Sequence, residues 1–128
     1  CCIYPTAPFI TLDLLKTAHL KLTVNNFETV LPIQKFGFPI QRALIQNNNR
    51  LEWAYPQYAN TRSQDLAPAY HDAGQFYFFQ VESFLKNNTL LTLNTSGIEI
   101  AEWEAHDIDN EDDWKLAKMK YRIIHESL

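Results

Sequence analysis

The chain has 128 residues, of which 46% are apolar and 20% are charged, and its formal net charge is −4 at pH 7. A chain of this length and composition forms one domain at most, with a core of its own. The acidic balance and the scatter of the eleven basic residues exclude a general nucleic-acid binder, because phosphate backbones are held by clustered Lys and Arg. No apolar stretch approaches the length that spans a bilayer, so we expect no membrane partner.

Periodicity and capping residues predict helices that alternate with strands. Thr11 can cap the first helix, and the asparagines at positions 47–49 tolerate the left-handed conformation that a hairpin turn needs. This alternation indicates an α/β layer structure with at least some parallel pairing. In chain order, the predicted elements are a buried strand ending at residue 4, a helix over 11–23, a strand over 27–34, a hairpin over 39–45 and 50–55, a long polar loop over 56–74, a strand over 75–80, a short helix over 81–86, strands over 90–94 and 98–103, and a final helix over 114–124.

The polar segment 56–74 carries donors and acceptors just before a strongly β-prone strand. Loops of this length in compact domains are usually functional or disordered, and this composition favours function. Arg62 offers a planar fork for a carboxylate or phosphate, and Gln64 can pair with amide or hydroxyl groups. A local ion pair between Arg62 and Asp65 is an equally good interpretation, and both stay open.

His71 stands next to Asp72, which suggests a carboxylate orienting an imidazole as in a hydrolase. The nucleophile would have to be a serine or one of the thiols at the start of the chain. No serine lies in a Gly-x-Ser-x-Gly turn. We therefore expect a surface histidine rather than a catalytic triad.

The start of the chain has two adjacent cysteines, Cys1 and Cys2. Neighbouring side chains in a strand point to opposite faces, so a disulfide between them is awkward and free thiols in a reducing cytoplasm are expected. The chain does not open with methionine, it begins as if inside a core strand, and it holds no Gly-rich phosphate loop. These features predict the C-terminal portion of a longer protein.

The acidic run over residues 106–114 precedes the final predicted helix. Asp107 and Asp109 are separated by one residue, so on an extended segment both carboxylates can project to the same side. Mg²⁺ is typically held by one or two carboxylates plus substrate phosphates, which points to phosphate chemistry. Asp109 or Asn110 can instead cap the helix, with the acidic residues that follow complementing its dipole.

Five segments, taken in order, carry a resemblance to a known family. Each is weak alone, but together they resemble the acylneuraminate cytidylyltransferases, and most closely the branch that acts on pseudaminic acid. The segments are Cys-Cys-Ile-Tyr-Pro-Thr-Ala-Pro-Phe at 1–9, Phe-Pro-Ile-Gln-Arg-Ala-Leu at 38–44, Arg-Ser-Gln-Asp at 62–65, His-Asp-Ala-Gly-Gln-Phe-Tyr at 71–77 and Asp-Ile-Asp-Asn-Glu-Asp-Asp-Trp at 107–114.

The resemblance implies an α/β fold, a Rossmann-like mixed sheet flanked by helices of the nucleotide-diphospho-sugar transferase type. Residues 1–128 would be the C-terminal part of a single cytidylyltransferase domain. Within it, residues 39–72 would form a hairpin and loop extension that pairs subunits into a homodimer and completes the neighbouring sugar site. The N-terminal nucleotide-binding half, with its CTP loop, would be absent, so we expect these 128 residues alone to be inactive.

The same resemblance implies transfer of CMP from CTP to a nonulosonic acid, with release of pyrophosphate, in the bacterial cytoplasm for surface glycan synthesis. Pseudaminic acid is favoured, because Tyr4 and His71 replace a Gln and an Arg that are usual in the sialic acid enzymes. Asp107 and Asp109 would hold Mg²⁺ and act in catalysis with Arg62. The residues expected to bind substrate are Tyr4, Arg42, Gln64, Asp65, His71, Gln75 and Tyr77, with Leu90 and Leu91 as candidate contacts for an acetamido methyl group.

Two alternatives remain at this stage. Within the family, the chain could belong to a CMP-sialic or CMP-legionaminic acid synthetase. Outside it, the chain could be a dimerisation or sugar-binding module without a reaction of its own.

Overall fold

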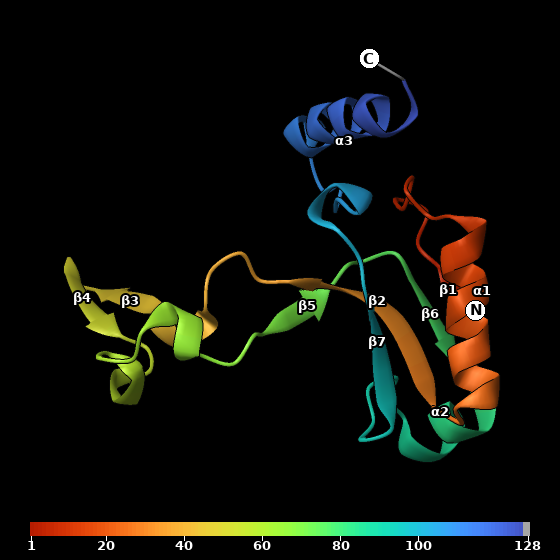
Figure 1. Ribbon diagram of the computed structural model, residues 1–128, viewed down its shortest axis with the longest axis horizontal. Coiled ribbons are helices and arrows are strands. Elements are labelled where there is room, and N and C mark those ends of the chain that lie inside the picture. Colours follow the sequence, from red (N-terminus) through yellow and green to blue (C-terminus); the bar gives the residue numbers. More distant parts are fainter. Residues whose placement is uncertain (127–128) are drawn as a thin grey trace. The chain divides into compact units, whose positions relative to one another are not determined.

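The computed structural model describes residues 1–126 as a mixed α/β chain. Helices and strands alternate through much of the chain, as the sequence predicts (Figure 1). The helices and strands are β1 (Cys2–Ile3), α1 (Leu12–Val24), β2 (Thr29–Lys35), β3 (Leu44–Asn47), β4 (Arg50–Trp53), β5 (Tyr70–Asp72), β6 (Phe76–Phe79), α2 (Val81–Asn87), β7 (Thr95–Glu99) and α3 (Glu111–His125).

The chain divides into two compact units, which are described separately. The main unit comprises Cys1–Gln34 and the chain from Asp72 onward, and the hairpin unit comprises Lys35–His71. Strands β2 and β5 run across the boundary between the units. The hairpin unit therefore covers almost the same residues as the predicted extension over 39–72.

The sheet of the main unit is mixed. Strand β6 pairs antiparallel with β1 on one side and with β2 on the other, and β2 pairs parallel with β7 over Thr29–Ile33. This confirms the predicted α/β class with some parallel pairing. The Rossmann-type assignment remains a prediction.

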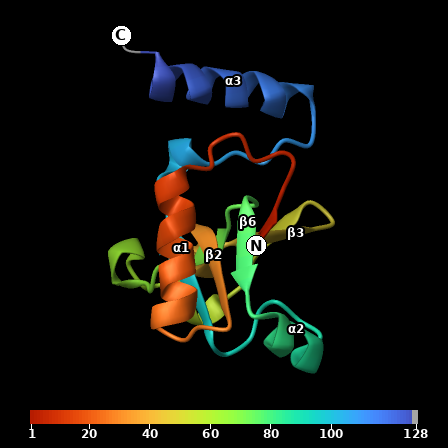
Figure 2. The ribbon, with the colours of Figure 1, turned by 90° about the vertical axis from the view of Figure 1, so that its right-hand side faces the viewer.

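Helix α1 covers one face of this sheet, alongside β6 (Figures 1 and 2). It begins where predicted, because the Thr11 hydroxyl accepts a hydrogen bond from the Leu14 backbone N–H at 3.2 Å. Ala18 of α1 meets Val30 of β2 and Phe76 of β6 in a cluster that is fully buried. Since side chains alternate along a strand, Phe76 and Phe78 face α1 and Tyr77 points to the opposite face.

The two strands predicted for residues 90–94 and 98–103 are replaced by a single strand, β7, at a different position. Residues 90–94 form a loop and β7 begins only at Thr95, because polar side chains in the loop compete for the backbone. Thr95 Oγ1 accepts from the Thr92 N–H at 2.9 Å, and Thr92 Oγ1 accepts from the Asn94 N–H at 3.1 Å. Strand β7 ends at Glu99, and a 3₁₀ turn, Glu102–Glu104, follows where the strand over 98–103 was predicted to end.

The burial predicted for the first strand is wrong, and the last helix is also largely exposed. Strand β1 lies at the edge of the sheet in the described part of the chain, and Ile3 is 50% exposed rather than buried. Helix α3 begins at Glu111, three residues earlier than predicted, and Ala117 is the one buried residue along it. Trp114 and Met119 on this helix are 51% and 60% exposed.

The hairpin unit contains the predicted β-hairpin. Strands β3 and β4 pair antiparallel with Asn47 opposite Arg50, and Asn48 and Asn49 both adopt positive φ, at 48° and 64°. Two consecutive left-handed residues are what a two-residue hairpin turn requires, and Asn tolerates this conformation well. The predicted loop over 56–74 is less irregular than expected, since it holds the 3₁₀ turns Pro56–Tyr58 and Ser63–Asp65 and strand β5.

Two smaller predictions can be compared directly with the structure. Cys1 and Cys2 are free thiols and both are exposed. Over residues 1–126, none of the helices combines the length and the apolar character that crossing a membrane demands.

Candidate functional site

A polar cluster of the main unit centres on two tyrosines of neighbouring strand segments. Tyr4 directly follows β1, and Tyr77 lies on β6, which pairs with β1. Their rings meet edge to face, with centroids 5.8 Å apart and planes at 61°. The two hydroxyl oxygens are 3.4 Å apart, and the Tyr77 hydroxyl donates a hydrogen bond to the Asp72 carboxylate. The three side chains therefore form one hydrogen-bonded chain.

The turn between β5 and β6 connects this chain to the acidic segment. Asp72 Oδ1 accepts a hydrogen bond from the Gly74 N–H at 2.8 Å, which closes the turn. Gly74 has φ +64°, a left-handed conformation that glycine adopts at little cost. A Cβ atom placed on Gly74 would lie 3.8 Å from Cγ of Asp107. The Asp107 carboxylate therefore lies against the turn that leads into Tyr77.

Gln75 joins the segments around this turn. Its backbone carbonyl accepts from the Tyr4 N–H at 2.9 Å, and its side-chain Nε2 donates to the Glu104 carbonyl at 2.6 Å. The side chain is 2% exposed, and its Oε1 atom has no hydrogen-bond partner within residues 1–126. Gln75 thus holds the segment after β1 and the segment before Asp107 at a fixed spacing.

The surroundings of Tyr77 favour its neutral form. Partial burial of the phenol, and then the hydrogen bonds to Asp72 and Tyr4, raise the pKa of Tyr77 well above its ordinary value of 10.0. At neutral pH the hydroxyl is therefore protonated and able to donate.

The acidic segment divides between a helix cap and two further carboxylates. The Asn110 side chain accepts from the N–H groups of Asp112 and Asp113, and Asp113 Oδ2 accepts in return from the Asn110 N–H at 3.1 Å. This is the predicted capping arrangement for α3. The carboxylates of Asp107 and Asp109 take no part in it. Both residues are exposed, and no hydrogen bond or ion pair engages either carboxylate in the described part of the chain.

Carboxylates such as these two are ligands of the kind that Mg²⁺ accepts when phosphate oxygens complete its coordination. Residues 1–126 contain no group of three or more His, Cys, Asp or Glu side chains that could hold a metal alone. Mg²⁺ does not need such a cage, because it is commonly held by one or two carboxylates together with waters and substrate phosphates. Asp107 and Asp109 supply two carboxylates that no hydrogen bond or ion pair engages within residues 1–126.

The other predicted site residues lie in the hairpin unit. Arg62 pairs with Asp65 through two contacts, at 2.8 Å and 3.4 Å, which confirms the local ion pair. The Arg42 guanidinium donates to the Thr61 carbonyl at 3.1 Å and lies 5.3 Å from the centroid of the Trp53 ring. Gln64 and His71 are exposed, and the His71 ring is 4.9 Å from that of Phe36. All these contacts hold the polar side chains within the hairpin unit itself.

The structure thus distributes the predicted site residues over both units. The main unit holds Tyr4, Gln75, Tyr77, Asp107 and Asp109, and the hairpin unit holds Arg42, Arg62, Gln64, Asp65 and His71.

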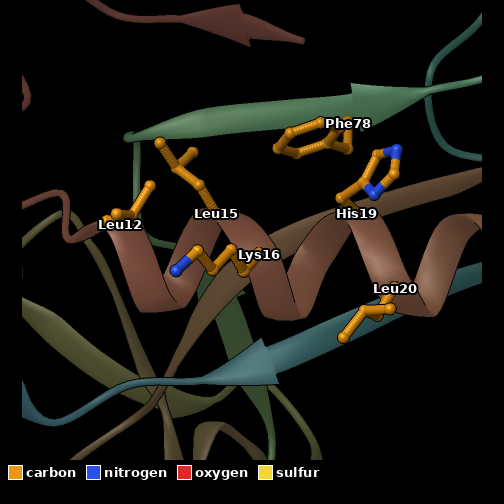
Figure 3. A pocket seen from close by; sticks show the side chains of 6 residues that line it. All are labelled: Leu12, Leu15, Lys16, His19, Leu20 and Phe78. Atoms are coloured by element: carbon orange, nitrogen blue, oxygen red, sulfur yellow. The ribbon is translucent and has the colours of Figure 1, made fainter.

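A shallow apolar pocket of about 410 Å³ lies on the α1 side of the main unit. Figure 3 shows the α1 side chains and Phe78 of β6 around it, with the His19 ring close to Phe78. The two ring centroids are 6.0 Å apart. None of the predicted site residues lines this pocket.

Known proteins resemble this chain over most of its length. No protein-family model matches it. Two proteins named pseudaminic acid cytidylyltransferase, from two strains of Campylobacter jejuni, are 36% and 35% identical over 128 residues, which is 99% of this chain. The chain is homologous to these cytidylyltransferases.

The match covers only part of each relative. The chain spans 55% of the length of the two Campylobacter proteins. A Helicobacter pylori protein named pseudaminic acid cytidylyltransferase and UDP-2,4-diacetamido-2,4,6-trideoxy-beta-L-altropyranose hydrolase is 29% identical over 109 residues, which is 84% of this chain and 21% of that protein. These names agree with the branch that the five sequence segments resemble.

Sequence reasoning missed the structural importance of Asp72 and Gly74. The pair His71-Asp72 suggested a hydrolase, but the Asp72 carboxylate bonds the Gly74 N–H and the Tyr77 hydroxyl instead. The pattern Asp-Ala-Gly over 72–74 was the available signal, since Asp often accepts from the backbone two residues on and Gly permits positive φ.

Proposed function

We propose that the protein containing this chain transfers CMP from CTP to a nonulosonic acid, with pseudaminic acid as the favoured substrate. The observation that carries the proposal is the similarity of 99% of the chain to proteins named for this reaction. The contact of Asp107 with Gly74 supports it, because this places an available carboxylate against the turn that Asp72 joins to the Tyr77 hydroxyl. The exposed free thiols agree with a reducing bacterial cytoplasm, where the product would serve surface glycan synthesis.

The reaction needs positioning and charge neutralisation more than covalent help from the protein. The anomeric hydroxyl oxygen of the sugar acid forms a bond to the α-phosphorus of CTP and gives up its proton to the solvent. The bond from that phosphorus to the bridging oxygen breaks, and pyrophosphate leaves with that oxygen. A bound Mg²⁺ ion supplies neutralisation of the phosphate charge. Asp107 and Asp109 are the residues that would hold this ion.

The remaining roles follow the chemistry of the side chains. Arg62, with Arg42, presents a guanidinium that can bind two oxygens of a phosphate or of the sugar carboxylate. To bind such an oxygen, the Arg62 guanidinium must break its ion pair with Asp65 or bind both partners at once. A surface ion pair of this kind is weak enough to be replaced by a ligand. The residues that we assign to the sugar acid are Tyr4, Gln64, Asp65, His71, Gln75 and Tyr77.

We also infer that the protein is a homodimer formed through the hairpin unit. All eight residues of β3 and β4 are exposed, and three large apolar side chains lie on one face of this hairpin. Leu44 pairs with Trp53 across the two strands, and Leu51 lies on the same face because side chains alternate. An exposed apolar face of this kind commonly marks a protein interface.

The test of the reaction is pyrophosphate release by the complete protein with CTP, Mg²⁺ and pseudaminic acid. We expect Asp107→Asn and Asp109→Asn each to lower kcat by at least about 100-fold, since even the outer partners of metal ligands typically contribute about 10- to 100-fold. Asp112→Asn is the matched control, because among the described residues its exposed carboxylate is engaged by Lys115 alone.

Three outcomes separate the alternatives. Unchanged turnover in both variants would remove the metal role from this pair. No turnover by the wild-type protein would favour a non-catalytic dimerisation or sugar-binding module. Faster turnover of sialic or legionaminic acid than of pseudaminic acid would keep the reaction and correct the substrate.

A further inference from the structure

The hydrogen-bond chain through Asp72, Tyr77 and Tyr4 has a fixed direction. An ionised carboxylate only accepts hydrogen bonds, so the single proton of the Tyr77 hydroxyl is directed at Asp72. In the contact between the two hydroxyls, Tyr77 can then only accept, and Tyr4 must donate its own proton. The Tyr4 oxygen is left with lone pairs and no proton for any further partner.

We propose that Asp72 is a positioning residue that makes Tyr4 an obligatory acceptor, so that Tyr4 selects an acylamino N–H group on the sugar acid. Tyr4 is 38% exposed, and it belongs to the same cluster as Gly74 and Asp107. A sugar hydroxyl can donate or accept and is not distinguished by such a group, whereas an amide N–H can only donate. This inference rests on the proposed function, because it names the substrate group read at the same site.

Substituting Asp72 by Asn reverses the direction of the chain without changing its shape. The Gly74 N–H requires an acceptor at Oδ1, so the amide oxygen of the new side chain stays there and its NH₂ group faces Tyr77. The Tyr77 oxygen then accepts, its proton turns to Tyr4, and the Tyr4 proton turns outward. Tyr4 then presents a hydrogen-bond donor to the substrate, and it can no longer accept a hydrogen bond from an amide N–H.

The test compares two substrates in the complete protein, namely the acylamino sugar acid and its ester analogue, in which oxygen replaces the N–H. For the wild type we expect kcat/KM to favour the amide by about tenfold, the effect of one well-placed hydrogen bond of this kind. For Asp72→Asn we expect this preference to disappear or to reverse, with kcat/KM for the ester retained. A turn that is merely damaged would lower both values together.

Two variants complete the comparison. Tyr77→Phe leaves the Tyr4 proton undirected and should give an intermediate preference, and Asp112→Asn should leave the preference unchanged. An unaltered preference for the amide in Asp72→Asn would overturn the inference, as would a wild-type enzyme that does not distinguish the two substrates.

A second measurement does not depend on turnover. The ultraviolet absorbance of ionised tyrosine is followed with rising pH in Asp72→Asn and wild type, each with and without Tyr77→Phe. Loss of the carboxylate should bring the pKa of Tyr77 down toward its ordinary value. An unchanged ionisation of Tyr77 would overturn the chain of contacts itself. If ionisation shifts but no sugar acid is turned over, the contacts stand and the proposed function, with the inference that rests on it, fails.

Discussion

Among single residues, Tyr77 makes the stability of the fold sensitive to alkaline pH. Its pKa is raised in the folded state by burial and by the bonds to Asp72 and Tyr4, whereas an unfolded tyrosine ionises near 10.0. Above that pH the unfolded state loses the proton and the folded state keeps it. Ionisation therefore favours unfolding, and the stabilising effect of the hydroxyl declines as the pH rises from about 10 toward the raised pKa.

We predict that Tyr77→Phe lowers the free energy of unfolding by about 1 kcal/mol at pH 7, the usual contribution of one hydrogen bond. The difference from the wild type should shrink between about pH 10 and pH 11. Urea unfolding of both proteins across this pH range measures the difference in the free energy of unfolding. The contributions of other titrating groups cancel in this difference because both proteins contain them. A stability difference that grows with pH would contradict the raised pKa of Tyr77 in the folded state.

At this scale, the sequence predicted those contacts that form within a few residues. The caps at Thr11 and Asn110, the asparagine turn and the pair of Arg62 with Asp65 all join residues at most four apart. The contact between Tyr4 and Tyr77 spans 73 residues and depends on the pairing of β1 with β6. No local rule predicts such a contact, so the cluster around Tyr77 became visible only in the structure.

Among the elements, the parallel pair of β2 and β7 depends on a small residue. A Cβ atom on Gly97 would lie 2.4 Å from Cδ1 and 2.9 Å from Cγ1 of Ile33, so Ile33 would have to move. We predict that Gly97→Ala lowers the free energy of unfolding by about 1–2 kcal/mol, since overpacking outweighs the gain in strand propensity. Chemical denaturation of the complete protein measures this loss.

The matched control is Gly37→Ala in the hairpin unit. An added Cβ there meets no atom within 4 Å among the described residues, so we expect a change of at most about 0.5 kcal/mol. Equal losses in the two variants would mean that contact with Ile33 does not decide the effect.

Helices were easier to predict than strands, for a physical reason. The start of α1 and the start of α3 each depend on a cap within the same segment. Helix α3 begins at Glu111, capped by Asn110, rather than at Trp114, because the acidic turn itself is helical. The ends of β7 depend on its partner, since its ladder with β2 runs only from Thr95 to Glu99. The composition of residues 90–103 suggested two strands, and the register with β2 permits one.

For the whole molecule, the resemblance to the cytidylyltransferases, rather than periodicity, predicted an extension over residues 39–72. The division into a main unit and a hairpin unit follows this boundary closely. The sequence could not indicate that half of the predicted site residues would lie in each unit. That distribution agrees with the expectation from the family resemblance that a neighbouring subunit completes each site, and it makes the oligomeric state the quantity to measure.

We predict that Leu51→Asp in the complete protein weakens the dimer by at least about tenfold in dissociation constant, because it places a charge on the apolar face formed with Leu44 and Trp53. Leu51 is 64% exposed in the chain, so the substitution should leave folding intact. Ile45→Asp is the matched control, since Ile45 is also half exposed but lies with Glu52 on the opposite face of the hairpin. Sedimentation velocity over a range of protein concentrations gives both constants. If the two variants dissociate equally, or if the wild type sediments as a monomer, the apolar face does not form the subunit contact and the site is completed in some other way.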